Sequence, residues 1–302
     1  MMFYIMNVEH FQTISRAAWG GQMVGDALGA SVEGKRRMDI LAHYPKGLDV
    51  MLPNSPIFGY RPMGSVTDDT QMALCLHRSL LDADGWAPQA AMARYLEWYH
   101  TDPPDVGCAT RAAMEGYPMP ESQGNGTLMR VMPLALWAAS HTGFDWETAV
   151  REDAALTHPN PNNADCNVVF VFAMLQAMEQ GATPQSVYNA TLARVRTLNI
   201  SPVVLKAVED AAAVRPVCDF RNTGWVVLAL HVALYHLLHA PDFRSALVDV
   251  VSSGGDTDTN AAITGALLGT LYGVDSIPSA WLAAVRANNE SEYVRLLPPR
   301  AS

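Results

Sequence analysis

The sequence lacks the marks of several large protein classes. No uninterrupted apolar stretch approaches the roughly 20 residues of a membrane-spanning helix, and no strong alternation of polar and apolar residues indicates a β-strand. Charged residues account for only 17% of the 302 residues and aromatic residues for 8%. We therefore expect no membrane span, and a fold in which sheet plays little part.

Basic residues are also in short supply. Lysine and arginine together number 20 against 30 aspartates and glutamates, which gives a formal net charge of −10. A broad nucleic-acid interface needs a basic face that displaces counterions from phosphates. This balance argues against nucleic acid as a partner, while a local basic pocket for one phosphorylated ligand stays open.

Cysteine is rare and scattered. The four cysteines, Cys75, Cys108, Cys166 and Cys218, include no CxxC pair and fall mostly in apolar helical stretches. They are typical of small core thiols in a reducing compartment. The apolar start at residues 1–12 has neither a basic leader nor a small-residue cleavage site. We predict a soluble, cytoplasmic protein without a signal peptide.

Alanine, leucine, valine and methionine are abundant and recur at helical spacing. Hydrophobic residues make up 49% of the sequence, enough for a substantial core. The spacing predicts helices over 11–31, 71–81, 87–100, 105–115, 127–140, 146–156, 163–179, 184–197, 203–214, 223–238, 243–251, 258–271 and 280–287. Prolines and a glycine make 48–58 the best place for an extended excursion. We predict an all-α fold, a compact orthogonal bundle of many helices in a single domain over 1–302, in which the small residues of 11–31 allow close helix packing.

Two dense acidic clusters stand near opposite ends of the chain, TDDT at 67–70 and DTDT at 256–259. Each opens a predicted helix, where aspartate and threonine are common N-caps for free backbone N–H groups. A cap needs only one acceptor, and adjacent carboxylates repel one another unless a cation neutralises them. Carboxylate and hydroxyl oxygens suit Mg²⁺ or Mn²⁺ better than zinc. If the clusters meet in space, they can hold a pair of divalent cations.

Three further carboxylates interrupt the helical pattern. Asp26 is costly in its apolar surroundings unless it is bonded, and we interpret it as an anchor for the start of a neighbouring loop. Glu33 lies at a predicted helix exit, where a carboxylate opposes the helix dipole and gains no capping benefit, which favours a functional role. Asp105, at a helix start, is by itself an ordinary cap.

A glycine-containing turn, GNGT at 124–127, precedes a predicted helix. Glycines let backbone N–H groups approach an anion at a helix start, so this turn is a candidate phosphate cradle, although Asn-Gly is also an ordinary turn. Arg130 could assist an anion or pair with an acidic neighbour. His158, at a helix end, is by itself no more than a cap or a satisfied surface group.

One rival motif is rejected. The DTDT cluster superficially matches the signature of aspartyl-phosphate phosphatases. That signature needs its first aspartate at the end of a buried strand, threonine or valine at the fifth position, and much chain afterwards. Here the fifth position is Asn260, and only a short tail follows.

Taken together, six segments resemble the ADP-ribosylglycohydrolase family, which includes the dinitrogenase reductase-activating glycohydrolase. They occur in the family's order and span Gly25 to Gly269. The segments are GDALGASVEG (25–34), TDDTQMAL (67–74), DVG (105–107), GNGTLMR (124–130), LTHPNP (156–161) and SGGDTDTNAAITGALLG (253–269). The TDDT and GGDTDT pair is the most specific. Family members are compact all-α bundles with a two-metal site, so the resemblance implies a central dinuclear site here.

The resemblance also implies roles for single residues. The implied metal ligands are Thr67, Asp68, Asp69, Asp256, Asp258 and Thr259, with Asp258 as a bridge between two ions of Mg or Mn. The implied substrate contacts are Gly124, Asn125, Gly126 and Thr127 along a diphosphate and His158 on a ribose. The implied catalytic carboxylates are Asp69, Glu33 and Asp105. Many relatives carry a second histidine where this chain has Asn160, which leaves the fine contacts of the ribose open.

The implied reaction is hydrolysis of a glycosidic bond of ADP-ribose, with arginine of a target protein as the expected leaving group and a metal-activated water as the nucleophile. Asp69 or Glu33 would accept the water proton, and Asp105 would hold the guanidinium. A second hypothesis changes the leaving group, to serine-linked ADP-ribose, O-acetyl-ADP-ribose or another conjugate. A third is a module that binds ADP-ribose without cleaving it. The implied partner is an ADP-ribosylated protein or conjugate, and a regulatory protein on the outer helices stays open.

Overall fold

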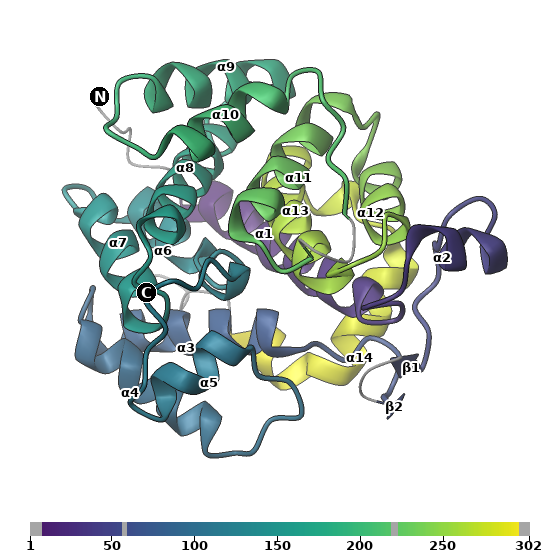
Figure 1. Cartoon of the computed structure of the whole chain (residues 1–302), viewed down its shortest axis with the longest axis horizontal. Helices are drawn as coiled ribbons and strands as arrows, with labels where there is room; N and C mark the ends of the chain where they lie inside the picture. The colour runs from purple at the N-terminus through teal and green to yellow at the C-terminus, as the bar shows by residue number, and fades with distance from the viewer. Residues whose placement is uncertain (1–7, 56–58, 219–222, 296–302) are drawn as a thin grey trace.

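Helices dominate the computed structural model, which describes residues 8–55, 59–218 and 223–295 (Figure 1). The α-helices are α1 Val8–Gly29, α2 Arg37–His43, α3 Asp68–Ala83, α4 Pro88–Tyr99, α5 Cys108–Met114, α6 Met132–Ser140, α7 Trp146–Thr157, α8 Pro161–Ala177, α9 Pro184–Val195, α10 Pro202–Asp210, α11 Val226–His239, α12 Phe243–Ser252, α13 Thr257–Tyr272 and α14 Ser279–Arg295. Short 3₁₀ turns lie at η1 Asn125–Thr127 and η2 Val274–Ser276. The predicted all-α fold is confirmed.

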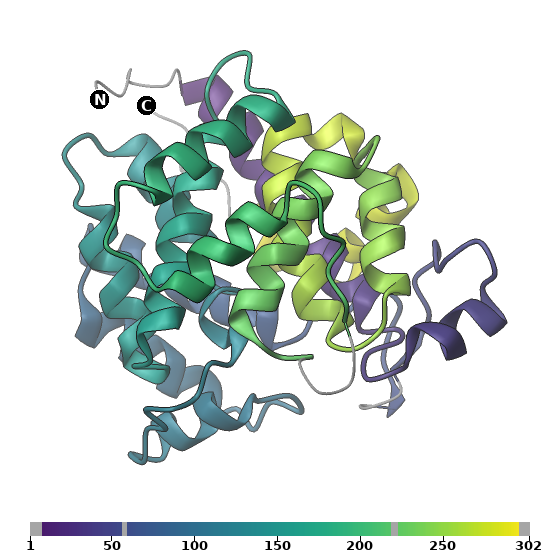
Figure 2. The same cartoon turned by 45° about the horizontal axis from the view of Figure 1, so that its top comes forward.

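The expected extended excursion is a small hairpin. Strand β1, Asn54–Ser55, pairs antiparallel with β2, Gly59–Tyr60, and the intervening residues 56–58 lie outside the described residues, as do residues 1–7 at the apolar start. Helix α2 and this hairpin stand out from the body at one side in both views (Figures 1 and 2). None of the helices within the described ranges is both long and apolar enough to cross a bilayer.

Helices α1 and α13 run side by side through the middle of the molecule (Figures 1 and 2). Their backbones touch, because a Cβ added to Gly21 would lie 2.0 Å from the Gly265 carbonyl oxygen and one added to Gly25 would lie 2.0 Å from that of Ala261. Only glycine permits such an approach. The prediction that small residues of the first helix allow close packing is confirmed.

This contact aligns the exit of α1 with the entry of α13. The Thr257 hydroxyl donates to the Gly29 carbonyl oxygen at 2.7 Å, and the backbone N–H of Gly34 donates to the Gly255 carbonyl oxygen at 2.9 Å. The acidic segment at 256–259 therefore lies beside Glu33, although more than 200 residues separate them in sequence. Buried apolar side chains from nearly every helix enclose α1 and α13 in one continuous cluster. That the chain forms a single domain stays a prediction.

Several helix boundaries differ from the expected ones. Helix α6 begins at Met132, not at 127, because Pro133 has no backbone N–H and sits in the first turn. Helix α5 begins at Cys108, so Asp105 lies in the preceding loop and does not cap it. Helix α2 was not expected. Its seven residues have little amphipathic pattern, and only Ile40 is buried.

Candidate metal and substrate site

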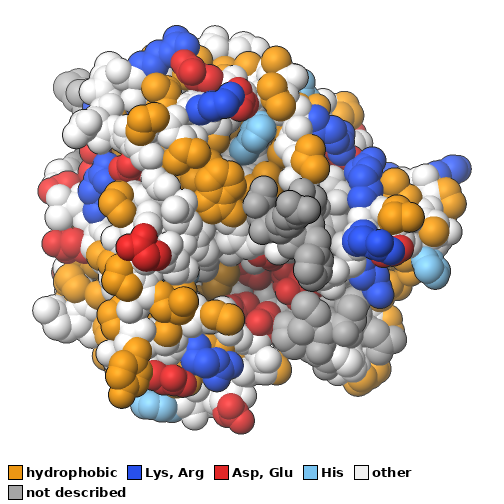
Figure 3. All heavy atoms as spheres, in the orientation of Figure 1, with side chains coloured by type: hydrophobic (Ala, Val, Ile, Leu, Met, Phe, Trp, Pro, Cys, Tyr) orange, Lys and Arg blue, Asp and Glu red, His pale blue; other side chains and the backbone are white. Residues whose placement is uncertain are grey.

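The two acidic clusters meet at one cavity of about 270 Å³. Its wall carries five carboxylates and the glycine-containing turn. The lining side chains singled out from the sequence are Glu33, Asp68, Asp105, Asp256, Asp258, Thr259, Asn125 and His158, together with Gly124 and Gly126. Acidic side chains fill the hollow in the molecular surface (Figure 3). Segments from both ends of the chain therefore build this site.

Neither acidic cluster is used for ordinary helix capping. Thr67 precedes α3 and Asp256 precedes α13, and neither side chain accepts a bond from its helix. The Oδ2 atom of Asp256 accepts instead from the Asn125 amide, 2.7 Å away. The capping interpretation of these two positions is wrong, since Asp256 bonds to the distant Asn125 and the Thr67 hydroxyl bonds to Asp26 and Asp69.

Asp26 is an anchor, as predicted, but the segment that it holds is the start of helix α3 and not the start of a loop. Its carboxylate accepts the backbone N–H groups of Thr67, at 2.9 Å, and of Thr70, at 3.1 Å, together with both threonine hydroxyls. Burial raises the pKa of Asp26 to about 6 even though these hydrogen bonds oppose the rise. The Thr67 hydroxyl also lies 2.8 Å from Oδ2 of Asp69. The carboxylate of Asp26 therefore orients the TDDT segment through Thr67 and Thr70.

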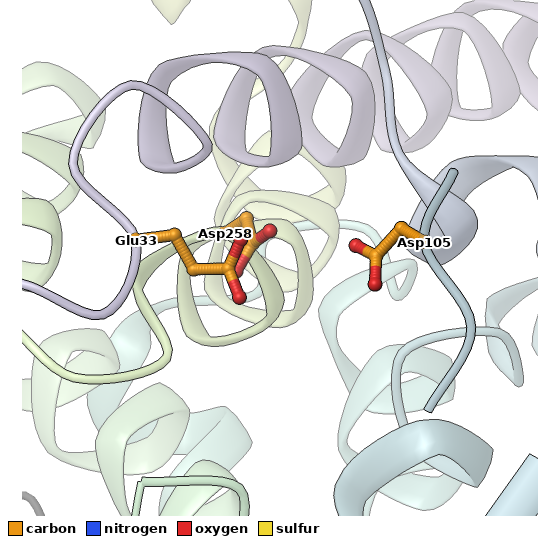
Figure 4. Close-up of side chains that lie close together, drawn as sticks. All are labelled: Glu33, Asp105 and Asp258. Carbon is orange, nitrogen blue, oxygen red and sulfur yellow. The ribbon is translucent and has the colours of Figure 1, made fainter. Parts of the chain in front are cut away.

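Glu33, Asp105 and Asp258 converge most closely, with one oxygen of each within 4.8 Å of the others. Glu33 and Asp258 lie together and Asp105 faces them (Figure 4). Burial, followed by the charges of Asp256 and Asp105, raises the pKa of Glu33 to about 8. Burial and the charge of Glu33 likewise raise the pKa of Asp258 well above its usual range. The crowded carboxylates repel one another and favour a cation between them.

The donor set fits hard divalent cations. Oε2 of Glu33 and Oδ1 of Asp69 are buried without a hydrogen-bond partner among the described residues, which is costly for a carboxylate unless a cation or solvent binds it. Among the six predicted ligands, Asp68, Asp256, Asp258 and Thr259 line the cavity. Thr67 and Asp69 lie directly behind them, almost fully buried. Oxygen is the only donor element in the set, as Mg²⁺ and Mn²⁺ prefer.

The GNGT turn lies beside the acidic segment at 256–259, because Asn125 donates to Asp256, but it does not open an α-helix. Its residues form the 3₁₀ turn η1, so the expected helix N-terminus is not available to an anion. A Cβ on Gly124 or Gly126 would lie 3.1 Å from the His158 ring, which explains both glycines. Thr127, the last residue of the turn, is fully buried and is not among the residues that line the cavity.

Arg130 ties this turn to His158. The buried guanidinium pairs with Asp153 at 3.1 Å and donates to the Gly126 carbonyl oxygen at 3.3 Å and to the Thr157 hydroxyl oxygen at 2.9 Å. Of its two sequence interpretations, pairing with an acidic neighbour is the one that the structure confirms.

The same contact favours one tautomer of His158. Arg130 can only donate, so the Thr157 hydroxyl accepts from it and has its own proton free for Nδ1 of His158, 2.8 Å away. Burial and the charge of Arg130 lower the pKa of His158 to about 3, so the ring is neutral. In the tautomer that this contact favours, Nε2 carries the ring proton, and the ring offers a hydrogen-bond donor beside Gly124 at the cavity wall.

Some lining residues escaped the sequence reasoning. Thr110, Ser122, Met129 and Gly224 also line the cavity, and the Asn163 amide holds the Gly124 carbonyl oxygen at 2.5 Å. Met129 lies in the GNGTLMR segment, but as an apolar residue it does not stand out there. The other four residues lie in none of the six segments, so no local signal singles them out. The Asn125–Asp256 hydrogen bond, across 131 positions, is likewise a tertiary feature.

Comparisons with known proteins agree with this geometry. The family model described as ADP-ribosylglycohydrolase matches residues 9–298. The chain is 31% identical to the ADP-ribosyl-[dinitrogen reductase] glycohydrolase of Rhodospirillum rubrum, over 92% of each chain. It is 30% identical to the ADP-ribosylarginine hydrolase Tri1 of Pseudomonas putida, over 91% of this chain and 75% of that protein.

A solved structure shows the same architecture. The chain superposes on an ADP-ribosylglycohydrolase-related protein complex with a TM-score of 0.79 and 30% identity, over 96% of this chain and 98% of that one. The sequence motifs, the helical fold and the acidic cavity thus coincide with a family match along almost the whole sequence. The chain belongs to the ADP-ribosylglycohydrolase family.

Proposed function

We propose that this enzyme removes ADP-ribose from modified protein side chains, with arginine as the preferred linkage. The observation that carries the proposal is the convergence of five carboxylates from both ends of the chain on one cavity beside a neutral histidine. Hydrolysis at the anomeric carbon develops positive charge on the ribose ring, and an acidic cavity stabilises that charge.

Two divalent cations, Mg or Mn, complete the proposed site. Thr67, Asp68, Asp69, Asp256, Asp258 and Thr259 would hold them, with Asp258 shared. Bound there, the cations would supply positive charge that acidifies water and orients the ribose hydroxyls. The unpartnered oxygens of Asp69 and Glu33 support this assignment.

Carboxylates at the cavity would handle the protons. Glu33 and Asp69 each have a buried oxygen without a partner among the described residues, but of the two only Glu33 lines the cavity. This difference favours Glu33 over Asp69 as the group that accepts the proton of the attacking water. Asp105 faces Glu33 from the α5 side (Figure 4) and would bind a guanidinium leaving group by charge-assisted hydrogen bonds.

The part of the wall that the GNGT turn and His158 form would bind the rest of the substrate. Gly124, Asn125, Gly126 and Thr127 would follow the diphosphate, where the missing side chains of the two glycines leave the backbone accessible. The Nε2–H group of His158 would donate to a ribose oxygen.

Arginine is preferred because Asp105 adds a carboxylate where a cationic leaving group would sit, and because the Pseudomonas relative is named for ADP-ribosylarginine. The assay compares ADP-ribosylarginine with serine-linked ADP-ribose and O-acetyl-ADP-ribose, in chelator and with Mg²⁺ or Mn²⁺ restored. We expect cation-dependent release of ADP-ribose from arginine. Release only from another conjugate would reverse the preference, and tight binding of ADP-ribose without turnover of any conjugate would identify a non-catalytic reader.

A further inference from the structure

A group of exposed cationic side chains lies next to the acidic cavity, and we call it the basic ridge. Its members are Lys35, Arg36, Arg37, Lys46, Arg215 and Arg244. They border two adjoining cavities of about 430 and 450 Å³ that share Arg37. Lysine and arginine side chains gather over α2 and α12 at the right of Figure 3, beside the acidic hollow. None of these side chains takes part in the proposed hydrolysis.

The ridge is positive in an otherwise acidic protein. Asp39, Asp49 and Asp249 are the acids that pair with its arginines, which leaves an excess of three positive charges in a chain of net charge −10. Lys35 and Lys46 make no ion pair with any described residue. Their ammonium groups are therefore available to an external anion.

The ridge and the acidic cavity share a wall. Glu33 borders the acidic cavity and the next residue, Gly34, borders the ridge. In the same way, Gly255 borders the ridge and the next residue, Asp256, borders the acidic cavity. Two hydrogen bonds of 2.9 Å, from Gly34 N–H to the Gly255 carbonyl oxygen and from Gly255 N–H to that of Lys35, hold the wall. Successive Cα atoms are about 3.8 Å apart. A polypeptide that inserts one side chain into the acidic cavity thus brings its neighbouring residues within reach of the ridge.

The surface between the cations is apolar, which suits a polypeptide better than an inorganic anion. Met38 is 66% exposed and Val217 is 71% exposed, and both line the cavity of about 430 Å³ beside Lys35 together with Pro216. Exposed apolar side chains rimmed by charge are typical of a protein contact. A free phosphate would use the cations and leave the apolar side chains in water.

We propose that the basic ridge binds acidic residues that flank the ADP-ribosylated side chain of the protein substrate. The inference rests on the proposed function, because it places the modified residue in the acidic cavity. The ridge then selects among modified proteins by the charge of their sequence around the modification, mainly through KM, since it contacts residues remote from the bond that breaks.

The test uses two peptides with one ADP-ribosylated arginine, flanked on both sides by aspartate and glutamate or by serine and glycine, and free ADP-ribosylarginine. We expect the wild-type protein to prefer the acidic peptide at 50 mM salt and to lose this preference near 0.5 M salt. Lys35→Gln with Lys46→Gln should lower kcat/KM for the acidic peptide roughly five- to tenfold, the size expected for two exposed ion pairs. Turnover of free ADP-ribosylarginine should stay within about twofold.

The matched control removes two cations elsewhere. Arg196→Gln with Lys206→Gln changes the net charge equally but lies on exposed parts of α9 and α10, where the side chains pair with Glu209 and Asp210. It should leave the peptide preference intact. Equal wild-type kcat/KM for the two peptides, or equal losses in the two double variants, would overturn the proposal.

Binding separates this proposal from the proposed function. Fluorescence anisotropy with the unmodified acidic peptide needs no turnover, so ridge-dependent binding with no hydrolysis of any arginine conjugate would refute the arginine activity and keep the ridge. Hydrolysis of free ADP-ribosylarginine without ridge-dependent peptide binding would support the arginine activity and refute the role of the ridge. Inorganic phosphate serves as a competitor, and tight phosphate binding with no affinity for the peptide would indicate a small-anion site and contradict the proposal.

Discussion

The hydroxyl oxygen of Thr157 lies 2.8 Å from Nδ1 of the adjacent His158, at the end of α7. Because Arg130 also donates to that oxygen, the hydroxyl proton is directed to the ring and the Nε2–H tautomer faces the cavity. A single hydroxyl therefore favours the tautomer in which the proton of this buried histidine lies on the cavity side.

Replacement of Thr157 should test this arrangement. Thr157→Val removes the proton donor for Nδ1, so we expect kcat/KM for ADP-ribosylarginine to fall about tenfold or more, whereas Thr157→Ser keeps the hydroxyl and most of the activity. Nitrogen NMR of the His158 ring should show the Nε2–H tautomer in the wild type and the serine variant. An unchanged tautomer with unchanged kinetics in the valine variant would show that the hydroxyl has no such role.

Asp258→Asn should separate catalysis from folding. Asp258 lies in the closest carboxylate group, and its loss as a shared cation ligand should lower turnover by roughly 100-fold or more. The overall fold should remain, since asparagine has nearly the same shape, and circular dichroism checks this. Asp275→Asn, in η2 away from the cavity, is the control and should retain activity. Near-normal turnover by Asp258→Asn in cation-replete buffer would defeat the ligand assignment.

Cation binding should be visible without any substrate. A ligand that binds only the folded state raises its stability, by about 2.7 kcal/mol at 100 times the dissociation constant. We therefore expect Mg²⁺ or Mn²⁺ to raise the melting temperature of chelator-treated wild-type protein. Asp258→Asn should show a smaller shift. Identical melting curves in chelator and in either cation would argue against a cation site in this cavity.

The contact between α1 and α13 should not accommodate a side chain in place of its glycines. Gly25→Ala would place a Cβ 2.0 Å from the Ala261 carbonyl oxygen, so the helices must separate, and we expect a loss of about 2 to 3 kcal/mol in the free energy of unfolding. Gly107→Ala is the control, because its new Cβ meets only the Thr110 hydroxyl, at 3.8 Å. Chemical denaturation measures both. Equal, small losses would mean that the helices adjust freely.

Acid should destabilise the protein partly through His77. The ring packs edge-on against Trp19, and burial, with a smaller contribution from the charge of Arg78, lowers its pKa to about 4 from 6.5. The unfolded state therefore binds an extra proton between these two values, so the stability present at pH 7 is lost as the pH falls through 6.5 towards 4.

His77→Gln should remove that dependence. The stability of the wild type relative to the variant should drop by about 2 kcal/mol between pH 7 and pH 4.5. Denaturant unfolding at several pH values measures the difference, and other titrating groups cancel in the comparison. Parallel stability curves for the two proteins would mean that His77 is protonated as easily in the folded state as in the unfolded one.

Much of the fold was predictable because it depends on local pattern. Apolar residues at helical spacing predicted most helices, and the small residues of α1 predicted its close packing. The boundary errors have local causes. Pro133 delays α6, and the short α2 is held by one buried side chain, Ile40, whose contacts are tertiary.

For the site as well, features in the local sequence were predictable and features that depend on tertiary contacts were not. The acidic clusters were recognisable as unusual, but their meeting followed from family resemblance, since no local rule relates residue 68 to residue 258. The bond between Asn125 and Asp256, the chain from Arg130 to His158 and the basic ridge join distant segments. Such relationships appear only when the backbone is in place.

The contact between α1 and α13 bears on how the protein is made in the cell. Helix α13 is synthesised more than 200 residues after α1, so the glycine contact cannot form until Gly265 has left the ribosome. Until then the apolar face of α1 is without its native neighbour. Closing so long a loop slows folding, and nascent chains that stall before residue 257 should depend on chaperones and show no hydrolytic activity.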